Sequence, residues 1–305
     1  IIKKDYLKEY VYFLTEKLKG EDFSSLNVAI DAGNAMAGFI LPALFEKLKI
    51  KYFPLYFELD GTFPNHEANP IKQENLRDLT QLVSDKKADL GVAFDGDADR
   101  IGFVDSKGRI VPNDFVLAAL AKFFLQERPG AKIIYGVSSS RIVRETIEQG
   151  GGVPLICRTG HSFFRRLTRE KKAYFGCENS GHCFFEDFFY ADSAIFTMLH
   201  VLRLLSRERK SLEDLVEPFR KYFSSGEINF EVSGKDKIIK ISAFNGKLAD
   251  SKFDINGNID IQDNANPLLD LSARLNLNVQ NNLIFLPNTL VENLKKTKLD
   301  GNLNI

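Results

Sequence analysis

The chain has 305 residues, 44% of them hydrophobic, and its 41 basic residues balance its 41 acidic ones. A chain of this length is too long for one ordinary hydrophobic core and fits two or three domains. A balanced charge without long runs of either sign argues against a nucleic-acid or membrane-surface protein. No stretch approaches the roughly 18 apolar residues of a membrane span, and the N-terminus does not look like a signal peptide. Three cysteines argue against a disulfide framework, so we expect a cytoplasmic protein.

The first hundred residues alternate between helical and strand patterns. A loop of small residues at 31–38 opens a helix that we expect to hold Pro42 near its first turn. The alternation is a βαβαβ pattern, which predicts a largely parallel sheet covered by helices. The predicted helices lie at 7–18 and around 76–83, and the predicted strands at 26–30, 52–57 and 90–94.

A second α/β unit of similar size follows, and the architecture looks duplicated although no sequence repeat is visible. It begins with a hairpin-like stretch at 101–111, whose turn is Ser106-Lys107-Gly108. The remaining predicted elements are helices at 113–126 and 141–149, strands at 132–137 and 153–156, and two packing helices at 191–206 and 212–223.

The strand at 90–94 ends in the sequence Asp95-Gly96-Asp97-Ala98-Asp99-Arg100. Open α/β sheets bind ligands in the crevice at the carboxyl ends of their strands. Three carboxylates so close together repel one another unless a cation joins them, and a set of oxygen ligands suits Mg²⁺. Arg100 has the planar, forked guanidinium that grips a phosphate. The sequence therefore predicts a magnesium site beside a phosphate group.

Three other interpretations of this loop are open. An EF-hand also begins with alternating aspartates, but it requires glycine and glutamate where this chain has Arg100 and Ser106. A phosphatase with an aspartate nucleophile places two aspartates after a buried strand, yet Asp99 stands where that class has threonine or valine. A solvated acidic turn is the structural alternative.

Two loops of the second unit carry polar side chains. The segment Arg158-Thr159-Gly160-His161-Ser162 joins a strand to a helix, where free helix N–H groups and a cation favour an anion. The segment from Gly176 to His182 brackets hydrogen-bonding side chains with glycines. Glu178 and Ser180, two residues apart on an extended loop, would face the same way and suit adjacent sugar hydroxyls.

His161 and His182 have a structural alternative, in which each merely braces its own loop. A zinc site is a second alternative because three cysteines lie near these histidines. Their spacing, however, matches none of the usual pairs of zinc ligands. The residues concerned are Cys157, His161, Cys177, His182 and Cys183.

Taken together, these motifs resemble the phosphomannomutase/phosphoglucomutase family of α-D-phosphohexomutases. The resemblance covers roughly residues 1 to 235. Its acidic loop, Asp95 to Arg100, and its sugar loop, Gly176 to His182, are about 80 residues apart and follow the family's order. It implies domains II and III of a four-domain enzyme, at 1–105 and 106–223, with mixed, mostly parallel sheets. The motifs that carry it are Asp95 to Arg100, Gly176 to His182, Thr159 to Ser162, and Asp60-Gly61-Thr62-Phe63-Pro64-Asn65-His66.

The resemblance also implies a reaction, in which hexose 1- and 6-phosphates interconvert through a 1,6-bisphosphate with Mg²⁺. Mannose or glucose phosphates would be the ligands, and neither nucleic acid nor a membrane is expected as a partner. The implied metal ligands are Asp95, Asp97 and Asp99; the implied catalytic residues are Arg100, His161 and His182; and the implied substrate-binding residues are Glu178, Ser180, Arg158, Thr159 and Gly160.

Two departures limit what the resemblance implies. The sequence contains no Ser-His-Asn-Pro segment, the site of the family's phosphoserine, so we expect this chain to be inactive by itself. A non-catalytic sugar-phosphate-binding fragment is therefore an open alternative. The second departure is a β-rich, atypical segment at 224–305, where we expect hairpin strands around an Asn256-Gly257 turn. The family's arginine, serine and threonine phosphate loop is not found there.

Overall fold

A computed structural model describes residues 5–222 and the backbone of three later strands, at 238–248, 251–260 and 268–276. The chain divides into two compact units, residues 1–222 and 223–305. The first unit contains two α/β halves, each built on one five-stranded sheet. These halves agree with the predicted fold class, and the predicted boundary between residues 105 and 106 remains a prediction.

The sheet of the first half has the order β2-β1-β3-β4-β5. Strands β1, β2 and β3 are parallel, whereas β4 runs antiparallel to both β3 and β5. The sheet is therefore mixed, with β4 alone reversed. The elements are α1 (Leu7–Lys17), β1 (Asn27–Asp31), α2 (Met36–Leu48), β2 (Lys51–Leu55), η1 (Gln73–Leu76), α3 (Arg77–Lys86), β3 (Leu90–Phe94), β4 (Ile101–Asp105) and β5 (Ile110–Val111).

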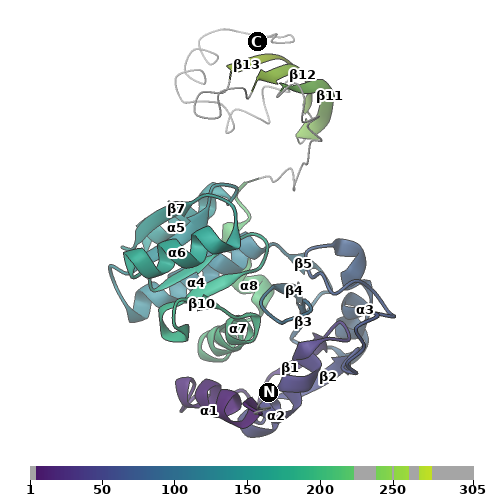
Figure 1. Cartoon of the computed structure of the whole chain (residues 1–305), viewed down its shortest axis with the longest axis vertical. Helices are drawn as coiled ribbons and strands as arrows, with labels where there is room; N and C mark the ends of the chain where they lie inside the picture. The colour runs from purple at the N-terminus through teal and green to yellow at the C-terminus, as the bar shows by residue number, and fades with distance from the viewer. Residues whose placement is uncertain (1–4, 223–237, 249–250, 261–267, 277–305) are drawn as a thin grey trace, which may run out of the picture. The chain divides into compact units, whose positions relative to one another are not determined.

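The second half repeats this arrangement in the order β7-β6-β8-β9-β10. Strands β6, β7 and β8 are parallel, and β9 runs antiparallel to β8 and β10. Helices α5 and α6 both contact the edge strand β7 (Figure 1). The elements are α4 (Asn113–Glu127), β6 (Lys132–Gly136), α5 (Arg141–Gln149), β7 (Val153–Cys157), α6 (His161–Lys171), β8 (Phe175–Cys177), β9 (Cys183–Phe185), η2 (Glu186–Phe188) and β10 (Ala191–Asp192).

The two sheets have the same strand order and directions, so β1 corresponds to β6, β3 to β8 and β4 to β9. The acidic loop joins β3 to β4, and the loop that contains Glu178 joins β8 to β9. Both loops follow the carboxyl end of a buried central strand, where polar side chains reach a ligand without breaking the sheet. The duplication expected from the alternation of elements thus places the two candidate loops at equivalent positions.

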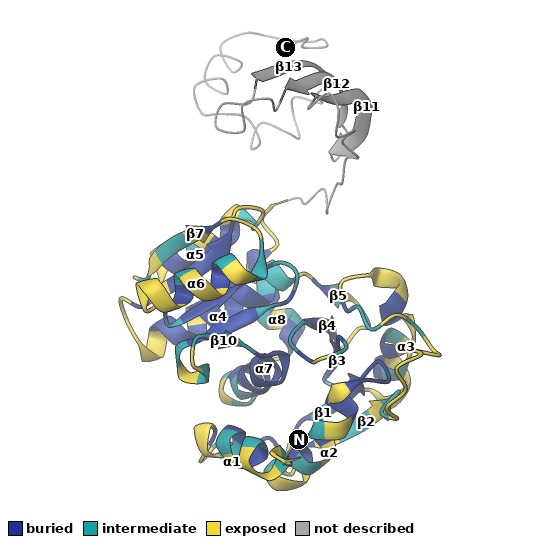
Figure 2. Cartoon of the chain, viewed as in Figure 1, coloured by how far each residue is buried: buried dark blue, intermediate teal, exposed yellow. Residues whose placement is uncertain are grey.

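Helix α7 (Ala194–Glu208) belongs to the core that the halves share. It is buried on nearly all sides (Figure 2) and contacts both α4 and β4. The predicted start at residue 191 is wrong, because Ala191 and Asp192 form β10 and Ser193 caps the helix by accepting a hydrogen bond from the Phe196 amide. The two halves therefore meet through packed apolar side chains.

Two other predicted helices differ from the structure. The helix predicted at 212–223 is short, since α8 (Leu212–Val216) gives way to the 3₁₀ turn η3 (Glu217–Phe219), which contains Pro218. Helix α2 begins at Met36, so Pro42 lies in its interior rather than near its first turn. None of the helices that the structure describes is long and apolar enough to cross a bilayer.

In the second unit, the described strands β11 (Ile238–Leu248), β12 (Ser251–Asp260) and β13 (Leu268–Asn276) pair in antiparallel order. Asn256-Gly257 lies within β12, where Gly257 pairs with Leu271, so the turn predicted there is wrong. Strand pairing with both neighbours outweighs the local turn preference of this dipeptide. The rest of the β-rich segment predicted at 224–305 lies outside the described residues.

Candidate active site

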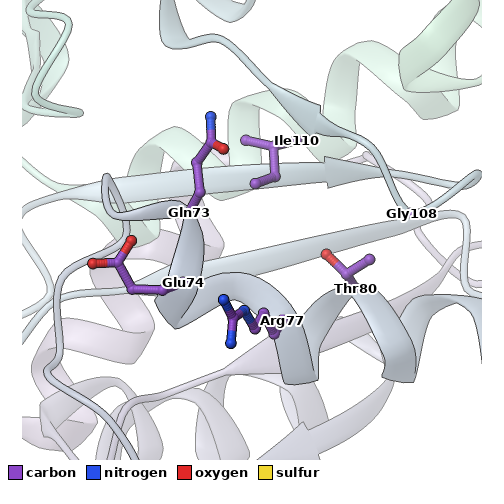
Figure 3. Close-up of a pocket in the computed structure, with 6 residues that line it drawn as sticks. All are labelled: Gln73, Glu74, Arg77, Thr80, Gly108 and Ile110. Carbon is purple, nitrogen blue, oxygen red and sulfur yellow. The ribbon is translucent and has the colours of Figure 1, made fainter. Parts of the chain in front are cut away.

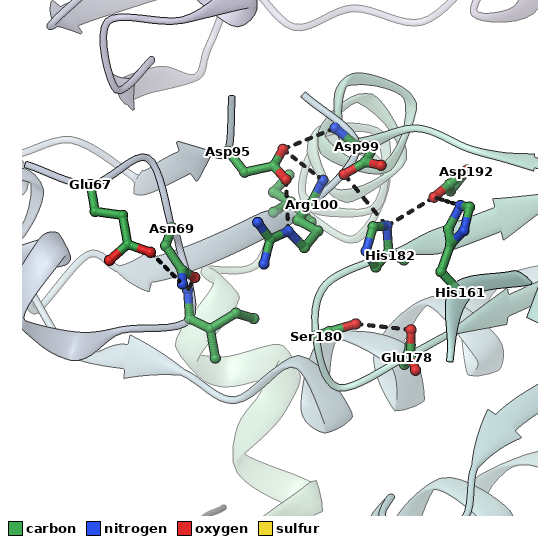
Figure 4. Close-up of polar contacts among 12 residues, drawn as sticks. Glu67, Asn69, Asp95, Asp99, Arg100, His161, Glu178, Ser180, His182 and Asp192 are labelled. Carbon is green, nitrogen blue, oxygen red and sulfur yellow. Dashed lines mark hydrogen bonds and ion pairs between the residues drawn. The ribbon is translucent and has the colours of Figure 1, made fainter. Parts of the chain in front are cut away.

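The acidic loop is organised by the buried carboxylate of Asp95. Its Oδ1 accepts the amide hydrogens of Asp99 and Arg100 at 3.1 and 3.0 Å. Its Oδ2 accepts a hydrogen bond from Arg100 Nε at 2.7 Å (Figure 4). Charge-assisted bonds of this kind are among the stronger ones in proteins. Asp95 therefore fixes both the turn of the loop and the direction of the Arg100 guanidinium.

The three aspartates of this loop, Asp95, Asp97 and Asp99, form a cluster that we call the acidic triad. Each offers a carboxylate oxygen, and these oxygens lie within 4.8 Å of one another. Burial raises the pKa of Asp99 well above its usual range; His182 opposes this effect, while Asp95 and Asp97 add to it. A divalent cation would relieve this repulsion, and the all-oxygen donor set fits Mg²⁺.

The loop from Glu178 to His182 is a tight turn, not the extended loop that we expected. The amide of Gly181 donates to the Glu178 carbonyl at 2.9 Å, which closes the turn between β8 and β9. The Glu178 side chain is buried; its Oε1 accepts the Gly160 amide at 2.9 Å, and its Oε2 accepts the Ser180 hydroxyl at 3.0 Å. The structure thus brings Gly160, Glu178 and Ser180 together.

Arg158 and Thr159 precede this contact on the loop between β7 and α6, and both are exposed. The Arg158 guanidinium lies 3.8 Å from the centroid of the Phe163 ring, a cation–π contact within the same loop and helix. Gly160 has a φ of 126°, a backbone conformation that would be strained for a residue with a side chain, and it directly precedes α6. The anion-binding role predicted for this loop remains a prediction.

The acidic loop and the Glu178 turn touch each other. Arg100 and His182 form an isolated antiparallel backbone bridge. The side-chain amide of Asn113 donates, through Nδ2, to the carbonyls of Ile101 and Asn179 at 3.2 and 3.1 Å. Gly181 makes this contact possible, because a Cβ there would lie 2.5 Å from the Ile101 carbonyl oxygen. Residues about 80 positions apart in sequence therefore line one site.

His161 and His182 converge on one carboxylate, that of Asp192. Its Oδ2 lies 2.8 Å from His182 Nδ1 and 3.0 Å from His161 Nε2, and His182 Nδ1 is 3.5 Å from Asp99 Oδ1 (Figure 4). Burial lowers the pKa of His182, but the hydrogen bond to Asp192 and the charge of Asp99 outweigh it, so the net shift is upward. His182 can therefore hold a proton beside the acidic triad.

Cys177 and Cys183 form a disulfide, contrary to the expectation from the cysteine count. The two residues face each other across the antiparallel strands β8 and β9, which brings their side chains together. Of the three cysteines, only Cys157 is free, and it is buried. The structure therefore does not support a zinc site made with cysteine thiolates.

A separate hollow lies between η1, α3 and the turn from β4 to β5 (Figure 3). None of its lining residues is among the predicted site residues. They are Gln73, Glu74, Arg77, Thr80, Gly108 and Ile110.

Comparisons with known families agree with this geometry. Residues 5–108 match phosphoglucomutase/phosphomannomutase, alpha/beta/alpha domain II, and residues 112–222 match domain III of the same family. The chain belongs to the phosphoglucomutase/phosphomannomutase family. The resemblance expected from the motifs is thereby confirmed.

Among curated members of the phosphoglucomutase/phosphomannomutase family, a phosphomannomutase/phosphoglucomutase of Pseudomonas putida is 40% identical over 219 residues, or 72% of this chain and 47% of that protein. A phosphomannomutase of Methanocaldococcus jannaschii is 35% identical over 244 residues, or 78% of this chain and 53% of that protein. The chain spans about half the length of the curated relatives that it matches.

Solved structures of the family show the same fold. A phosphoglucomutase/phosphomannomutase family protein of Burkholderia thailandensis matches with a TM-score of 0.71 and 27% identity, over 100% of this chain and 67% of that one. An N-acetylphosphoglucosamine mutase of Aspergillus fumigatus, in complex with GlcNAc-6P and magnesium, matches with a TM-score of 0.52 and 14% identity, over 70% of this chain and 52% of that one. The second likeness concerns the fold alone.

Two residues of this candidate site, Asp192 and Asn113, are not predicted from the sequence. Asp192 was placed inside a packing helix, although an Asp-Ser pair directly before an apolar helix signals its N-terminus and could have exposed the carboxylate. Asn113, directly after Pro112, was read only as a helix start. No local signal predicts that its amide joins the two loops.

Proposed function

We propose that this chain is the metal- and sugar-binding part of a phosphomannomutase/phosphoglucomutase. Such an enzyme interconverts hexose 1-phosphate and 6-phosphate through a hexose 1,6-bisphosphate and requires Mg²⁺. The observation that carries the proposal is the backbone bridge between Arg100 and His182, which joins the acidic loop to the Glu178 turn. Family membership and the phosphomannomutases among the relatives support the same reaction.

The acidic triad is proposed to hold the metal ion. Bound Mg²⁺ would neutralise charge on a phosphoryl group, which phosphoryl transfer requires more than any covalent chemistry. Arg100, whose Nε is held by Asp95 at 2.7 Å, retains its terminal N–H groups for phosphate oxygens. The positions of these groups are set by the loop before any ligand arrives.

The Glu178 turn is proposed to hold the sugar. A carboxylate has about four acceptor sites, and Gly160 and Ser180 use two of those on Glu178, so hydroxyl groups can still donate to it. Ser180 can both donate and accept. Arg158, Thr159 and the N–H groups at the start of α6 would attract a phosphate, and Arg158 is exposed to meet it.

His161 and His182 are proposed to hold and deliver a proton at the hexose hydroxyl. The Asp192 carboxylate orients both rings and favours the protonated form of His182, whose pKa is raised by that contact and by Asp99 despite burial. A cationic ring there also complements the phosphate charge. Asp192 is thus a positioning residue for the two imidazoles.

The chain contains no Ser-His-Asn-Pro segment, so we expect it to bind its ligands without mutase turnover. The alternative of a non-catalytic sugar-phosphate-binding fragment makes the same prediction for this chain. The two proposals differ only in whether a segment with the phosphoserine restores mutase activity. The rival phosphatase is disfavoured because Asp95, its nucleophile, already accepts three hydrogen bonds from its own loop.

Calorimetric titration of glucose 1,6-bisphosphate and mannose 1,6-bisphosphate into the chain, with Mg²⁺ present, tests the proposal. We expect saturable binding that is lost in the double variant Asp97→Asn/Glu178→Ala, which removes one group from each loop. Arg144→Gln, on the exposed face of α5, is the matched control and should bind as the wild type does. Binding that survives the double variant would contradict the proposal, as would phosphate release from these esters.

A further inference from the structure

Four side chains from both α/β halves converge next to the acidic triad: Asp99, His161, His182 and Asp192. We call them the histidine–aspartate cluster. Each offers one possible ligand atom, and the four atoms lie within 4.8 Å of one another. Three of the separations between such atoms are 2.8, 3.0 and 3.5 Å. The cluster is therefore compact enough for one ion to reach all four groups.

The donor set of this cluster differs from that of the acidic triad. Two imidazole nitrogens and two carboxylate oxygens suit Zn²⁺ and similar ions, whereas Mg²⁺ prefers oxygen ligands alone. Ligands about 2.0–2.1 Å from a tetrahedral zinc lie roughly 3.3 Å apart, so the three separations of 2.8, 3.0 and 3.5 Å require only small side-chain movements. Two carboxylates and two neutral imidazoles also balance the charge of a divalent ion.

The surroundings of the cluster combine rigidity with access. Asp192 is fixed by strand pairing with Phe184, and His182 by its backbone bridge to Arg100. The side chains of Asp192 and His182 are 9% and 14% exposed, while that of His161 is 41% exposed. The two largely buried side chains keep their positions, and the exposed side chain of His161 leaves an ion a route of entry.

We infer that the histidine–aspartate cluster is a second metal site, which takes Zn²⁺ or a similar transition-metal ion. This site goes beyond the proposed mutase function, which places Mg²⁺ at the acidic triad and a proton on His161 and His182, so an ion in the cluster would take the place of that proton. It also differs from the cysteine-containing zinc site considered from the sequence, because Cys177 and Cys183 are bonded to each other. Asp99 belongs to both donor sets, so an ion in the cluster draws on a ligand of the acidic triad.

The test is a Zn²⁺ titration of the chain with ¹⁵N-labelled histidine, followed through the ring nitrogens by long-range ¹H–¹⁵N correlation spectra. The chain has four histidines, so each ring can be assigned by substitution. We expect the signals of His182 Nδ1 and His161 Nε2 to move to metal-bound positions, with each ring keeping a proton on its other nitrogen. The rings of His66 and His200 should not change, and thiol binding would not produce this pattern.

Variants then assign the ligands. His161→Gln and Asp192→Asn should each weaken Zn²⁺ binding at least tenfold. His66→Gln, the same substitution outside the cluster, should leave the affinity unchanged, and so should Asp97→Asn, which affects only the acidic triad. Thermal unfolding without metal verifies that each variant is folded, and the exposed His161 keeps the test valid if Asp192→Asn does not fold.

Two results would overturn the inference: ring signals of His161 and His182 that do not respond to Zn²⁺, or an Asp97→Asn variant that loses as much Zn²⁺ affinity as Asp192→Asn. The second result would place the zinc on the acidic triad. Because the titration uses the metal alone, failure of the proposed sugar-phosphate binding would not affect its outcome.

Discussion

The loop between β3 and β4 and the loop between β8 and β9 occupy equivalent places in two sheets with the same strand order, but they are stabilised differently. The first is held internally, since the Asp95 carboxylate accepts hydrogen bonds from its own loop. The second is held from outside, since Glu178 accepts the Gly160 amide from a different loop. The duplicated fold therefore fixes where the two loops leave their sheets, while a few side chains determine how each loop is held.

Each loop contains a glycine, and the two glycines should respond very differently to alanine. At Gly181, φ is +94° and a Cβ would lie 2.5 Å from the Ile101 carbonyl oxygen. We expect Gly181→Ala to lower the free energy of unfolding by about 3 kcal/mol and to abolish bisphosphate binding. Urea unfolding measures the first effect and calorimetry the second.

Gly96→Ala is the matched control, because a Cβ at Gly96 would lie 4.0 Å from Phe63 Cζ, an ordinary van der Waals distance. Its free energy of unfolding should change by less than about 0.5 kcal/mol. Equal effects of the two substitutions would show that the loops do not pack against each other as described.

The first half carries an ion pair whose contribution to stability should fade at high pH. His66 Nε2 lies 2.9 Å from the buried Asp31 carboxylate, and this hydrogen bond raises the pKa of His66 to about 9. A raised histidine pKa stabilises the fold below the ordinary value near 6.5, and this stabilisation is lost as the pH rises through about 9. We expect His66→Gln to lower the free energy of unfolding by about 2 kcal/mol at pH 6 and to change it little at pH 10. A pH-independent difference in urea unfolding would rule out the charged pair.

The second half should show the opposite dependence on pH. His200 is buried among the rings of Phe124, Phe185 and Phe196, and burial lowers its pKa to about 3. The neutral ring must take up a proton on unfolding below about pH 6.5, so its stabilising contribution is lost as the pH falls. The free energy of unfolding of His200→Phe, relative to that of the wild type, should therefore rise by about 2 kcal/mol as the pH falls from 8 to 5. Parallel unfolding curves for the two proteins would contradict this explanation.

The smallest expected effect concerns metal binding by the acidic loop. Burial, together with Asp95 and Asp97, raises the pKa of Asp99, and Mg²⁺ must displace that proton. We expect the affinity for Mg²⁺ to rise several-fold from pH 6 to pH 8, with proton release detectable by calorimetry in buffers of different ionisation enthalpy. Asp99→Asn should bind more weakly and without this pH dependence. Equal affinities at both pH values would count against a shifted carboxyl group.

Local pattern was enough to predict most of the fold. The strand at 90–94, the hairpin at 101–111 and the helix at 141–149 agree with the structure, because apolar periodicity and turn residues act over a few positions. The helix predicted at 212–223 failed because Pro218 turns the chain within it. At Asn256-Gly257 a strong turn preference yielded to strand pairing.

The acidic triad could be predicted because its residues are adjacent in sequence and lie at a strand end. The contacts that assemble the rest of the site could not, since they join distant segments. Asp192 reaches His161 and His182 only after β10 pairs with β9, and Asn113 bridges two loops after the halves have packed. The Cys177–Cys183 disulfide likewise depends on cross-strand register rather than on the number of cysteines.

Measuring Mg²⁺ affinity with and without glucose 1,6-bisphosphate would decide whether the two loops form one site. Ligands that share a site change each other's affinity reciprocally. We expect the bisphosphate to strengthen Mg²⁺ binding in the wild type, and we expect this coupling to disappear in Glu178→Ala, although Glu178 is not part of the acidic triad. The same Mg²⁺ affinity with and without the bisphosphate would contradict it.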